Sequence, residues 1–247
     1  MYQGSRIAVV VPAYREQQRI EVTIAGLPSW VDHVVVVDDA SDDGTSARVR
    51  ALADTRVTLI RHEANRGVGA AIVSGYRAAL AQGADVLVVM AGDNQMDPRD
   101  LPALLAPVVW GHADYVKGNR FLHVEAARMP LPRRLGSAAL SRLTRALTRL
   151  DVDDTQCGYT ALGANAARAL PLEELWPRYG YPNDLLGMLA ARRLLVREVP
   201  VRPVYAGEAS GLRPWHLATI AWVALRRHAL ERGTRSAASS LGDVAIS

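Results

Sequence analysis

The chain lacks the features of a disulfide-stabilised or membrane-spanning protein. Its 247 residues include a single cysteine, Cys157, so neither an internal disulfide nor a zinc site built on paired cysteines can form. This usage is compatible with a reducing compartment. No uninterrupted run of about 18 apolar residues occurs, so a spanning helix is not expected. Residues 1–6 show no signal-peptide pattern, and we therefore expect a cytoplasmic protein.

Two common phosphate-binding motifs are also missing. The chain has no Gly-Lys-Ser/Thr phosphate loop, and the glycine motif at residues 65–69 lacks the third glycine of a dinucleotide-binding fingerprint. The net charge is only +4, nearly all of it an arginine excess, which is too small to argue for a nucleic-acid partner. A mild arginine excess instead suits a phosphate-bearing ligand or an anionic membrane surface.

Alternating strands and helices occupy the first hundred residues, within an ordinary globular composition of 49% hydrophobic and 22% charged residues. Apolar, largely β-branched runs, typical of strands buried on both faces, stand at 7–11, 31–37, 57–60 and 85–90. Helices are expected at 16–27, from 45 to about 53, and at 70–82. This alternation predicts an α/β fold with a Rossmann-like, mostly parallel sheet flanked by helices.

The pattern changes after residue 115. Residues 115–121 resemble a strand and its exit, and 122–133, with two prolines, are expected to form a mobile loop. Two amphipathic helices rich in arginine are expected at 135–150 and 214–232. Each either packs on the domain or lies on a membrane surface, and the pattern leaves both alternatives open. The tail 233–247 is expected to be disordered.

Polar loops follow three of the expected strands, at 12–16, 38–39 and 92–98. In sheets of this kind ligands bind beyond the carboxyl ends of the strands. Asp93 and Gln95 alternate in the last loop, so both can direct an oxygen toward one point, where Mg²⁺ or Mn²⁺ accepts such ligands together with phosphate oxygens. The alternative interpretation of this cluster is a turn with capping carboxylates.

Three further groups suit a phosphorylated ligand. Asp38 and Asp39 can accept hydrogen bonds from a ribose or a base, or can be spare acids beside a helix N-cap. The glycines at 65–69 let backbone approach a ligand closely. Three arginines precede the first basic helix: Arg120, Arg133 and Arg134. They either clamp a second phosphate group or are solvated charges on the surface.

An ordered series of motifs stands at residues 10–16 (VVPAYRE), 36–45 (VVDDASDDGT), 65–71 (NRGVGAA), 92–98 (GDNQMDP), 118–121 (GNRF), 133–135 (RRL), 154–159 (DTQCGY) and 197–201 (REVPV). Over about residues 6–212 this series resembles the inverting family 2 glycosyltransferases of GT-A fold. Within that family it looks most like the dolichyl- or polyprenyl-phosphate sugar synthases. The resemblance implies one domain over 1–232, with nucleotide-binding residues in about 6–100 and acceptor-binding residues in about 101–232.

The resemblance, with the loops above, gives an expected set of site residues. The nucleotide-sugar site comprises Pro12, Ala13, Tyr14, Glu16, Asp38, Asp39, Asn65, Gly67, Gly69, Gly92 and Asp93. Asp93 and Gln95 would bind Mg²⁺ or Mn²⁺. The acceptor phosphate would be held by Arg120, Arg133, Arg134 and Arg213.

The chain departs from the family pattern in three places. The first acid of the Asp-x-Asp signature falls at Ala91, so one carboxylate ligand is absent. The Gly-Glu-Ser-Lys segment is only approximated at residues 207–213, where Arg213 stands for the lysine. The pair of C-terminal spanning helices found in some members is missing.

The expected reaction is metal-dependent, inverting transfer of a hexose from GDP-mannose or UDP-glucose to a polyprenyl or dolichyl phosphate, by a protein that is peripheral on the cytoplasmic membrane face. A phosphate acceptor needs no strong general base. The alternative is a hydroxyl acceptor, with Asp184 as the base at the position where hydroxyl-using relatives carry theirs. A nucleotidyltransferase ranks low because residues 12–16 replace its glycine-rich loop, and a non-catalytic nucleotide-sugar-binding protein gains weight from Ala91.

Overall fold

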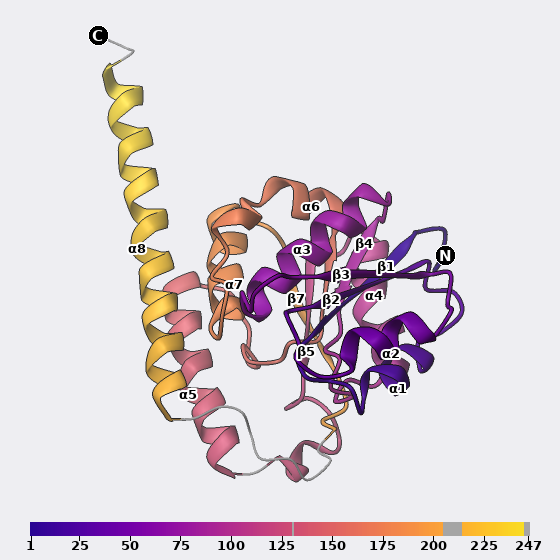
Figure 1. Ribbon diagram of the computed structural model, residues 1–247. Helices are drawn as coiled ribbons and strands as arrows, with labels where there is room; N and C mark the ends of the chain where they lie inside the picture. Colours follow the sequence, from indigo (N-terminus) through magenta and orange to yellow (C-terminus); the bar gives the residue numbers. More distant parts are fainter. Residues whose placement is uncertain (130, 205–213, 245–247) are drawn as a thin grey trace.

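A seven-stranded sheet forms the centre of the computed structural model, which describes residues 1–129, 131–204 and 214–244 (Figure 1). Its strands are β1 (Ile7–Ala13), β2 (His33–Asp38), β3 (Val57–Arg61), β4 (Val86–Val89), β5 (Tyr115–Asn119), β6 (Thr160–Gly163) and β7 (Val196–Pro200). They lie in the order β3-β2-β1-β4-β6-β5-β7. All the pairings are parallel except those of β6, which runs antiparallel to β4 and β5. The expected α/β fold with a mostly parallel sheet is confirmed.

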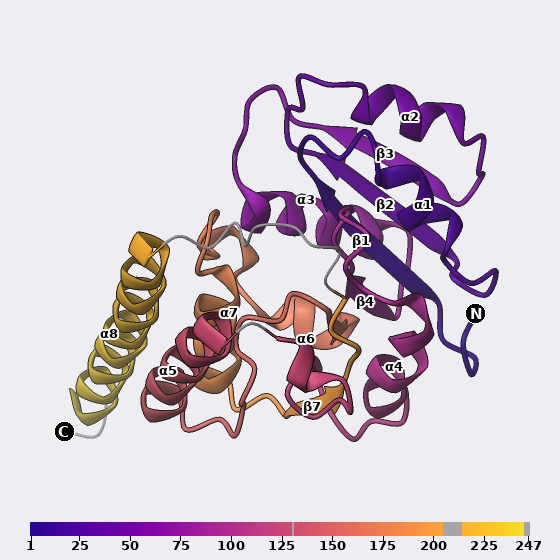
Figure 2. The same cartoon turned by 90° about the horizontal axis from the view of Figure 1, so that it is seen from below.

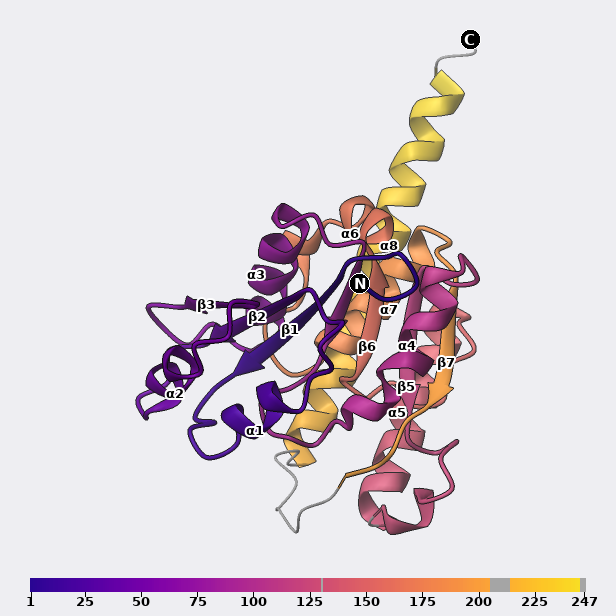
Figure 3. The same ribbon diagram turned by 90° about the vertical axis from the view of Figure 1, so that its right-hand side faces the viewer.

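Two hydrophobic cores lie on opposite faces of the sheet because successive strand residues point to opposite sides. In β1, Ala8 and Val10 belong to one core and Val9 and Val11 to the other, and all four are fully buried. The first core also takes residues from α3 (Val68–Ala81), α6 (Ala164–Ala169) and α7 (Tyr181–Ala191). The second takes residues from α1 (Ile20–Ala25), α2 (Thr45–Ala51) and α4 (Leu101–Val109). The sheet is therefore covered on both faces (Figure 3).

Two long helices form an outer layer beyond α7 (Figure 2). Helix α5 (Leu131–Thr148) and helix α8 (Pro214–Val244) both contact α7 and each other. Leu140, Ile220 and Val223 are buried at these contacts, so apolar residues of both helices pack on the domain. Within the described ranges, no helix combines the length and the apolar character that crossing a bilayer requires.

Three expected helix boundaries are wrong by a helical turn or more, and two of them are helix starts. Helix α1 begins at Ile20 instead of residue 16, because residues 17–19 form a turn and the N-cap Arg19 leaves the helical conformation, with φ −120° and ψ −25°. Helix α5 begins at Leu131, inside the loop expected over 122–133.

Helix α8 continues past the expected end at Arg232 into the tail expected to be disordered, and it reaches Val244. The tail has no proline to stop it, and its alanines favour helix. Residues 245–247 lie outside the described part of the chain.

Candidate active site

A pocket of about 480 Å³, here called the strand-end pocket, opens where β1, β2 and β4 end. It brings together most residues of the expected nucleotide-sugar site, namely Pro12, Ala13, Tyr14, Glu16, Asp39, Asn65, Gly67, Gly92 and Asp93. These residues come from four loops, which follow β1, β2, β3 and β4 and meet at the carboxyl edge of the parallel strands. Ala91, Arg178 and Tyr179 line it as well.

The loops at this edge are held in strained conformations. Arg15, Ala40 and Asn94 follow β1, β2 and β4, and each has a left-handed backbone, with φ of 60°, 62° and 57°. Such a backbone costs an ordinary side chain about 1–2 kcal/mol. The first loop is fixed by the guanidinium of Arg15, which donates to both oxygens of Asp42 at 2.7 and 2.6 Å. Of the seven non-glycine residues with a left-handed backbone among the described residues, three therefore lie in the loops that shape the pocket, and such strain is common at ligand sites.

Asp39 shapes the pocket floor by binding backbone. One carboxylate oxygen accepts from the Arg66 N–H at 2.9 Å and lies 2.7 Å from Nδ1 of His62. The other accepts from the Gly67 N–H at 2.7 Å. His62 in turn lies 2.9 Å from the hydroxyl of Ser74. Asp39 therefore fixes the loop that begins α3, and it still contributes to the pocket wall.

Asp38, its neighbour, lies outside the pocket. Its side chain is fully buried and accepts from the Ser41 N–H at 2.8 Å and from the Ser46 hydroxyl. Arg61 lies 3.5 Å from the same carboxylate. The structure thus places Asp38 in the turn that leads into α2, where it satisfies polar groups of the chain itself.

Gly67 and Gly69 are packed against protein backbone. A Cβ at Gly69 would lie 2.2 Å from the carbonyl oxygen of Trp176, and one at Gly67 would lie 2.4 Å from that of Pro177. The Gly69 N–H donates to the Pro177 carbonyl at 2.8 Å. We expected these glycines to let backbone approach a ligand closely. Gly69 instead lies close to the segment before α7, and it does not line the pocket.

A second pocket of about 160 Å³, here called the arginine pocket, adjoins the first. It is lined by Asp93, Gln95, Met96, Arg120, Gln156, Cys157, Gly158, Tyr159, Val201, Arg202 and Val204. Asp93 lines both pockets. Its carboxylate accepts the Gln95 N–H at 3.0 Å, which fixes the two expected metal ligands relative to each other.

The donor atoms present suit a hard divalent cation only together with a ligand. Among the described residues, no three side chains from His, Cys, Asp and Glu gather in a metal-binding group. The chain offers the Asp93 carboxylate and the Gln95 amide, in one loop. Mg²⁺ and its chemical neighbours commonly bind through one or two carboxylates plus substrate phosphates and water. The residues fit a cation that a diphosphate helps to hold.

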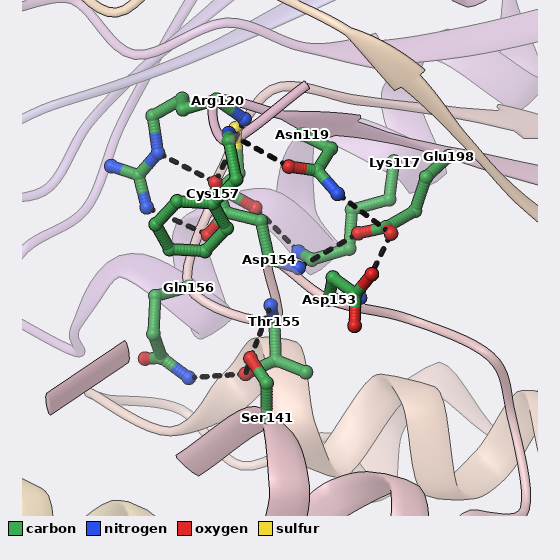
Figure 4. Close-up of polar contacts among 11 residues, drawn as sticks. Lys117, Asn119, Arg120, Ser141, Asp153, Asp154, Thr155, Gln156, Cys157 and Glu198 are labelled. Carbon is green, nitrogen blue, oxygen red and sulfur yellow. Dashed lines mark hydrogen bonds and ion pairs between the residues drawn. The ribbon is translucent and has the colours of Figure 1, made fainter. Parts of the chain in front are cut away.

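Arg120 is held in the arginine pocket by a buried polar network (Figure 4). Its Nε and Nη2 donate to Asp154 at 2.7 and 2.8 Å, and its side chain is 12% exposed. Glu198 accepts the N–H groups of Asp153 and Asp154 at 2.8 and 2.9 Å. Lys117 donates to the Cys157 carbonyl at 2.5 Å. The network thus fixes both Arg120 and the loop that faces it.

Burial and charge act in opposite directions on the acids of this network. Burial alone would raise the pKa of Asp154, but the charge and hydrogen bonds of Arg120 hold that pKa below its ordinary value. At Glu198 burial prevails and raises the pKa, although three N–H donors oppose it. Burial lowers the pKa of Lys117. The ion pair between Arg120 and Asp154 therefore persists in the folded protein at neutral pH.

Four other predicted residues lie apart from the pockets or cannot be placed. Arg134 is exposed in the first turns of α5 and lines neither pocket, and Arg133 belongs to the same helix. Arg213 lies outside the described residues. Asp184 is fully buried on α7, where it lies 2.9 Å from Nε of Arg227 and accepts the Trp176 N–H at 2.8 Å.

Three charged or aromatic residues of the pockets lie outside every sequence motif and were not predicted. Arg178 and Tyr179 reach the strand-end pocket from the loop before α7, and Arg202 reaches the arginine pocket from just after β7. No motif marks Arg178 or Tyr179. Arg202 follows the motif at residues 197–201, so its position beyond a strand end was a usable signal.

The fold and the two adjoining pockets define an α/β protein of the GT-A class. The structure resembles glucosyl-3-phosphoglycerate synthase from Mycobacterium tuberculosis, solved with Mn²⁺, uridine diphosphate and glucosyl-3-phosphoglycerate, with a TM-score of 0.70 at 23% identity over 92% of this chain and 81% of that one. At this identity the likeness shows the fold. Residues 8–163 match the model of Glycosyl transferase family 2, and the chain belongs to that family. It is a glycosyltransferase.

Three curated relatives are 29%, 30% and 34% identical to the chain over the aligned residues. An undecaprenyl-phosphate mannosyltransferase of Micrococcus luteus is 34% identical over 79% of this chain and 82% of its own. A UDP-N-acetylglucosamine–dolichyl-phosphate N-acetylglucosaminyltransferase of Methanococcus voltae is 29% identical over 81% and 86%. A polyprenol monophosphomannose synthase of Mycolicibacterium smegmatis is 30% identical over 79% and 76%.

Proposed function

We propose that this glycosyltransferase moves a hexose from a nucleotide sugar to a polyprenyl or dolichyl phosphate, with inversion at the sugar carbon. The observation that carries the proposal is the position of Asp93 in the walls of both pockets. The strand-end pocket would hold the donor, and the arginine pocket the acceptor phosphate. The reacting bond would then lie beside Asp93.

The donor would extend from the ends of β1 and β2 toward Asp93. Tyr14, which is 42% exposed, offers a ring face to the nucleoside, and Asp39 and Gly67 form the floor. Arg178 supplies a guanidinium for the diphosphate. That the structurally similar synthase was crystallised with uridine diphosphate supports a nucleotide in this pocket. The relatives' names favour mannose or N-acetylglucosamine among the sugars transferred, and donors of the GDP-mannose and UDP-glucose types are the first to test.

A divalent cation, Mg²⁺ or Mn²⁺, would complete the site. Asp93 and Gln95 would hold it together with the donor diphosphate, in keeping with the Mn²⁺ present in the structurally similar synthase. When bound, such a cation neutralises charge that develops on a diphosphate leaving group. Ala91 removes one carboxylate from this edge, so the chain alone offers the cation a weak site.

The acceptor phosphate would be oriented by guanidinium groups. Arg120 and Arg202 line the arginine pocket, and Arg134 lies on the exposed start of α5. A phosphate dianion is already nucleophilic at neutral pH. The site therefore needs groups that orient the acceptor phosphate, and it needs no base to deprotonate it. Asp184, the base that a hydroxyl acceptor would require, is engaged with Arg227 and the Trp176 N–H and lines neither pocket. This arrangement favours a phosphate acceptor, and the names of three relatives agree.

Product analysis with matched acceptors tests the proposal. Purified protein with Mn²⁺ is given radiolabelled GDP-mannose, UDP-glucose or UDP-N-acetylglucosamine, and either a polyprenyl phosphate or the corresponding polyprenol. We expect label in the lipid phosphate with at least one donor, loss of transfer in excess chelator, and none in the polyprenol. Transfer to the alcohol, or to neither lipid with all three donors, would overturn the proposed acceptor.

We also propose that the chain contacts a membrane surface near the acceptor site. Apolar side chains are exposed around the start of α5, with Val124 at 93%, Leu131 at 65% and Leu135 at 63%. A Cβ at Gly136 would lie 3.7 Å from Leu217, so the start of α8 adjoins them. Exposed leucines beside arginines are typical of interfacial helices. Sedimentation with anionic vesicles should carry the protein down, and a protein that stays in the supernatant at low salt contradicts the idea.

A further inference from the structure

Residues 176–180 form the wall of the strand-end pocket that comes from the second half of the chain. Arg178 and Tyr179 line the pocket. The Nη atoms of Arg178 also lie 3.5 and 3.3 Å from the side-chain and backbone oxygens of Asn65 across the pocket rim. The position of this segment therefore sets the width of the pocket.

On its inner side the segment is fixed to the start of α3. The Pro177 carbonyl accepts the N–H groups of Gly69 and Ala70 at 2.8 and 3.2 Å. The absence of side chains at Gly67 and Gly69 permits this contact, because a Cβ at either would overlap the Trp176 or Pro177 carbonyl. The inner contact is thus built from backbone and leaves little freedom.

On its outer side the segment is held by a buried ion pair between α7 and α8. Asp184 is fully buried and Arg227 is 2% exposed. Arg227 donates from Nε and Nη2 to the two carboxylate oxygens of Asp184 at 2.9 and 3.1 Å. The same carboxylate accepts the Trp176 N–H at 2.8 Å, and Nη2 of Arg227 also donates to the Glu174 carbonyl at 3.0 Å. The ion pair therefore binds the backbone at the start of the segment.

Aromatic contacts with α8 extend this hold to the residues that face the pocket. Tyr179 stacks on His216, with ring centroids 4.4 Å apart and an angle of 28°. Trp176 meets Trp222 edge to face at 5.5 Å, and the guanidinium of Arg226 lies 5.7 Å from the Trp176 ring centre. Figure 2 shows α8 alongside α7 at this side of the molecule. The outer wall of the pocket thus rests on α8.

We infer that α8 is a positioning element for donor binding, and that Asp184 and Arg227 are positioning residues that act through the 176–180 segment. The inference rests on the proposed function, which places the donor in the strand-end pocket. A merely structural α8 would change stability alone. A positioning α8 changes the affinity of the folded protein for a nucleoside diphosphate as well.

The test uses two substitutions that leave the buried ion pair intact. His216→Ala and Trp222→Ala each remove one aromatic contact with the segment, and Trp222 is 53% exposed, so the fold tolerates its loss. Leu225→Ala, an exposed position on the same helix, is the matched control. Calorimetric titration with UDP and with GDP, in Mn²⁺, gives the dissociation constants, and thermal unfolding gives the stability of each variant.

We expect Kd to rise about threefold to tenfold in His216→Ala and Trp222→Ala, which is the effect of losing one aromatic contact. Leu225→Ala should bind as the unsubstituted chain does. Equal Kd in all four proteins overturns the inference and leaves the proposed function standing. Absence of binding in the unsubstituted chain contradicts the proposed function itself.

Hydrogen exchange supplies a readout that needs no ligand. Three amide hydrogen bonds hold the 176–180 segment, from Trp176 to Asp184 and from Gly69 and Ala70 to the Pro177 carbonyl. These amides should exchange faster in His216→Ala and Trp222→Ala than in the control, because a less firmly held segment breaks these bonds more often. Asp184→Asn with Arg227→Gln extends the test, because replacing both charges avoids a lone buried ion. This double variant should show the same weakened binding, and unchanged exchange and unchanged Kd in it would also overturn the inference.

Discussion

Among single side chains, Asp93 has the largest expected effect on catalysis because it borders both pockets. Asp93→Asn keeps the size of the side chain and removes the charge that a cation requires. We expect kcat to fall about 100-fold or more, comparable to the loss of one strong electrostatic contact to a transition state. Asp151→Asn, at a side chain that is 91% exposed, is the control. Full activity of Asp93→Asn across a Mn²⁺ titration would contradict the proposed site.

Arg202 is expected to bind the acceptor rather than the donor. Its guanidinium lies 3.4 Å from Asp97 and 4.0 Å from Glu125, distances longer than the 2.6 Å between Arg99 and Asp97. Arg202→Ala should raise KM for a polyprenyl phosphate about tenfold, as loss of a charged hydrogen bond would, with nucleotide affinity unchanged. Arg99→Ala, whose side chain is 74% exposed, is the control. Weaker nucleotide binding with normal acceptor KM would contradict the assignment.

The contribution of Asp154 to the stability of the fold should depend on pH. The neighbouring Arg120 holds the pKa of Asp154 below the ordinary 3.8 despite burial. A carboxyl of this kind stabilises the folded state above its unfolded pKa, and the contribution is lost as the pH falls through the folded value. Asp154→Asn should therefore lose about 3–5 kcal/mol of unfolding free energy at neutral pH. Urea unfolding at decreasing pH should show this difference shrinking below about pH 4, and a constant difference contradicts the prediction.

Among the helices, two glycines should respond to substitution by alanine with opposite changes in stability, because one is tightly packed and the other is not. A Cβ at Gly75 in α3 would lie 2.2 Å from Val10 of β1, whereas at Gly136 in α5 the nearest atom is 3.7 Å away on Leu217. Gly75→Ala should cost about 1–3 kcal/mol through overpacking, and Gly136→Ala should gain up to about 1 kcal/mol from helix propensity. Urea unfolding measures both. A stabilised Gly75→Ala would show that α3 packs less tightly on the sheet.

The elements that follow from local patterns were predictable, and those that depend on distant contacts were not. Strands β1 and β2 are continuous apolar runs, which require burial wherever they lie. Residues 16–19 have a helical pattern, yet they precede α1 and residues 17–19 form a turn. The Glu16 N–H donates to the Thr45 hydroxyl, a contact between loops that no local pattern reveals. The first turn of α5 lies in a segment with two prolines, and these prolines led to the prediction of a loop. Proline is nevertheless tolerated at a helix start.

For the molecule as a whole, the sequence predicted the sheet, the carboxyl-edge location and most of the strand-end pocket. It could not separate acids that face a ligand from acids that satisfy the chain itself, because Asp38 and Asp39 are adjacent and differ only in what lies around them. The division into a nucleotide-binding half and an acceptor-binding half stays a prediction. Under the proposed function Arg178 and Tyr179, from the second half, would also face the donor, because the segment before α7 folds back onto the start of α3.

The proposed transfer depends on a cation held jointly by Asp93, Gln95 and a nucleoside diphosphate. Calorimetric titration of UDP or GDP, in the presence of Mn²⁺ and in the presence of chelator, tests this directly. Since the chain supplies one carboxylate, we expect Mn²⁺ alone to bind weakly, and diphosphate affinity to rise at least about tenfold when Mn²⁺ is present. Diphosphate binding of equal strength with Mn²⁺ and with chelator would contradict the proposed cation site.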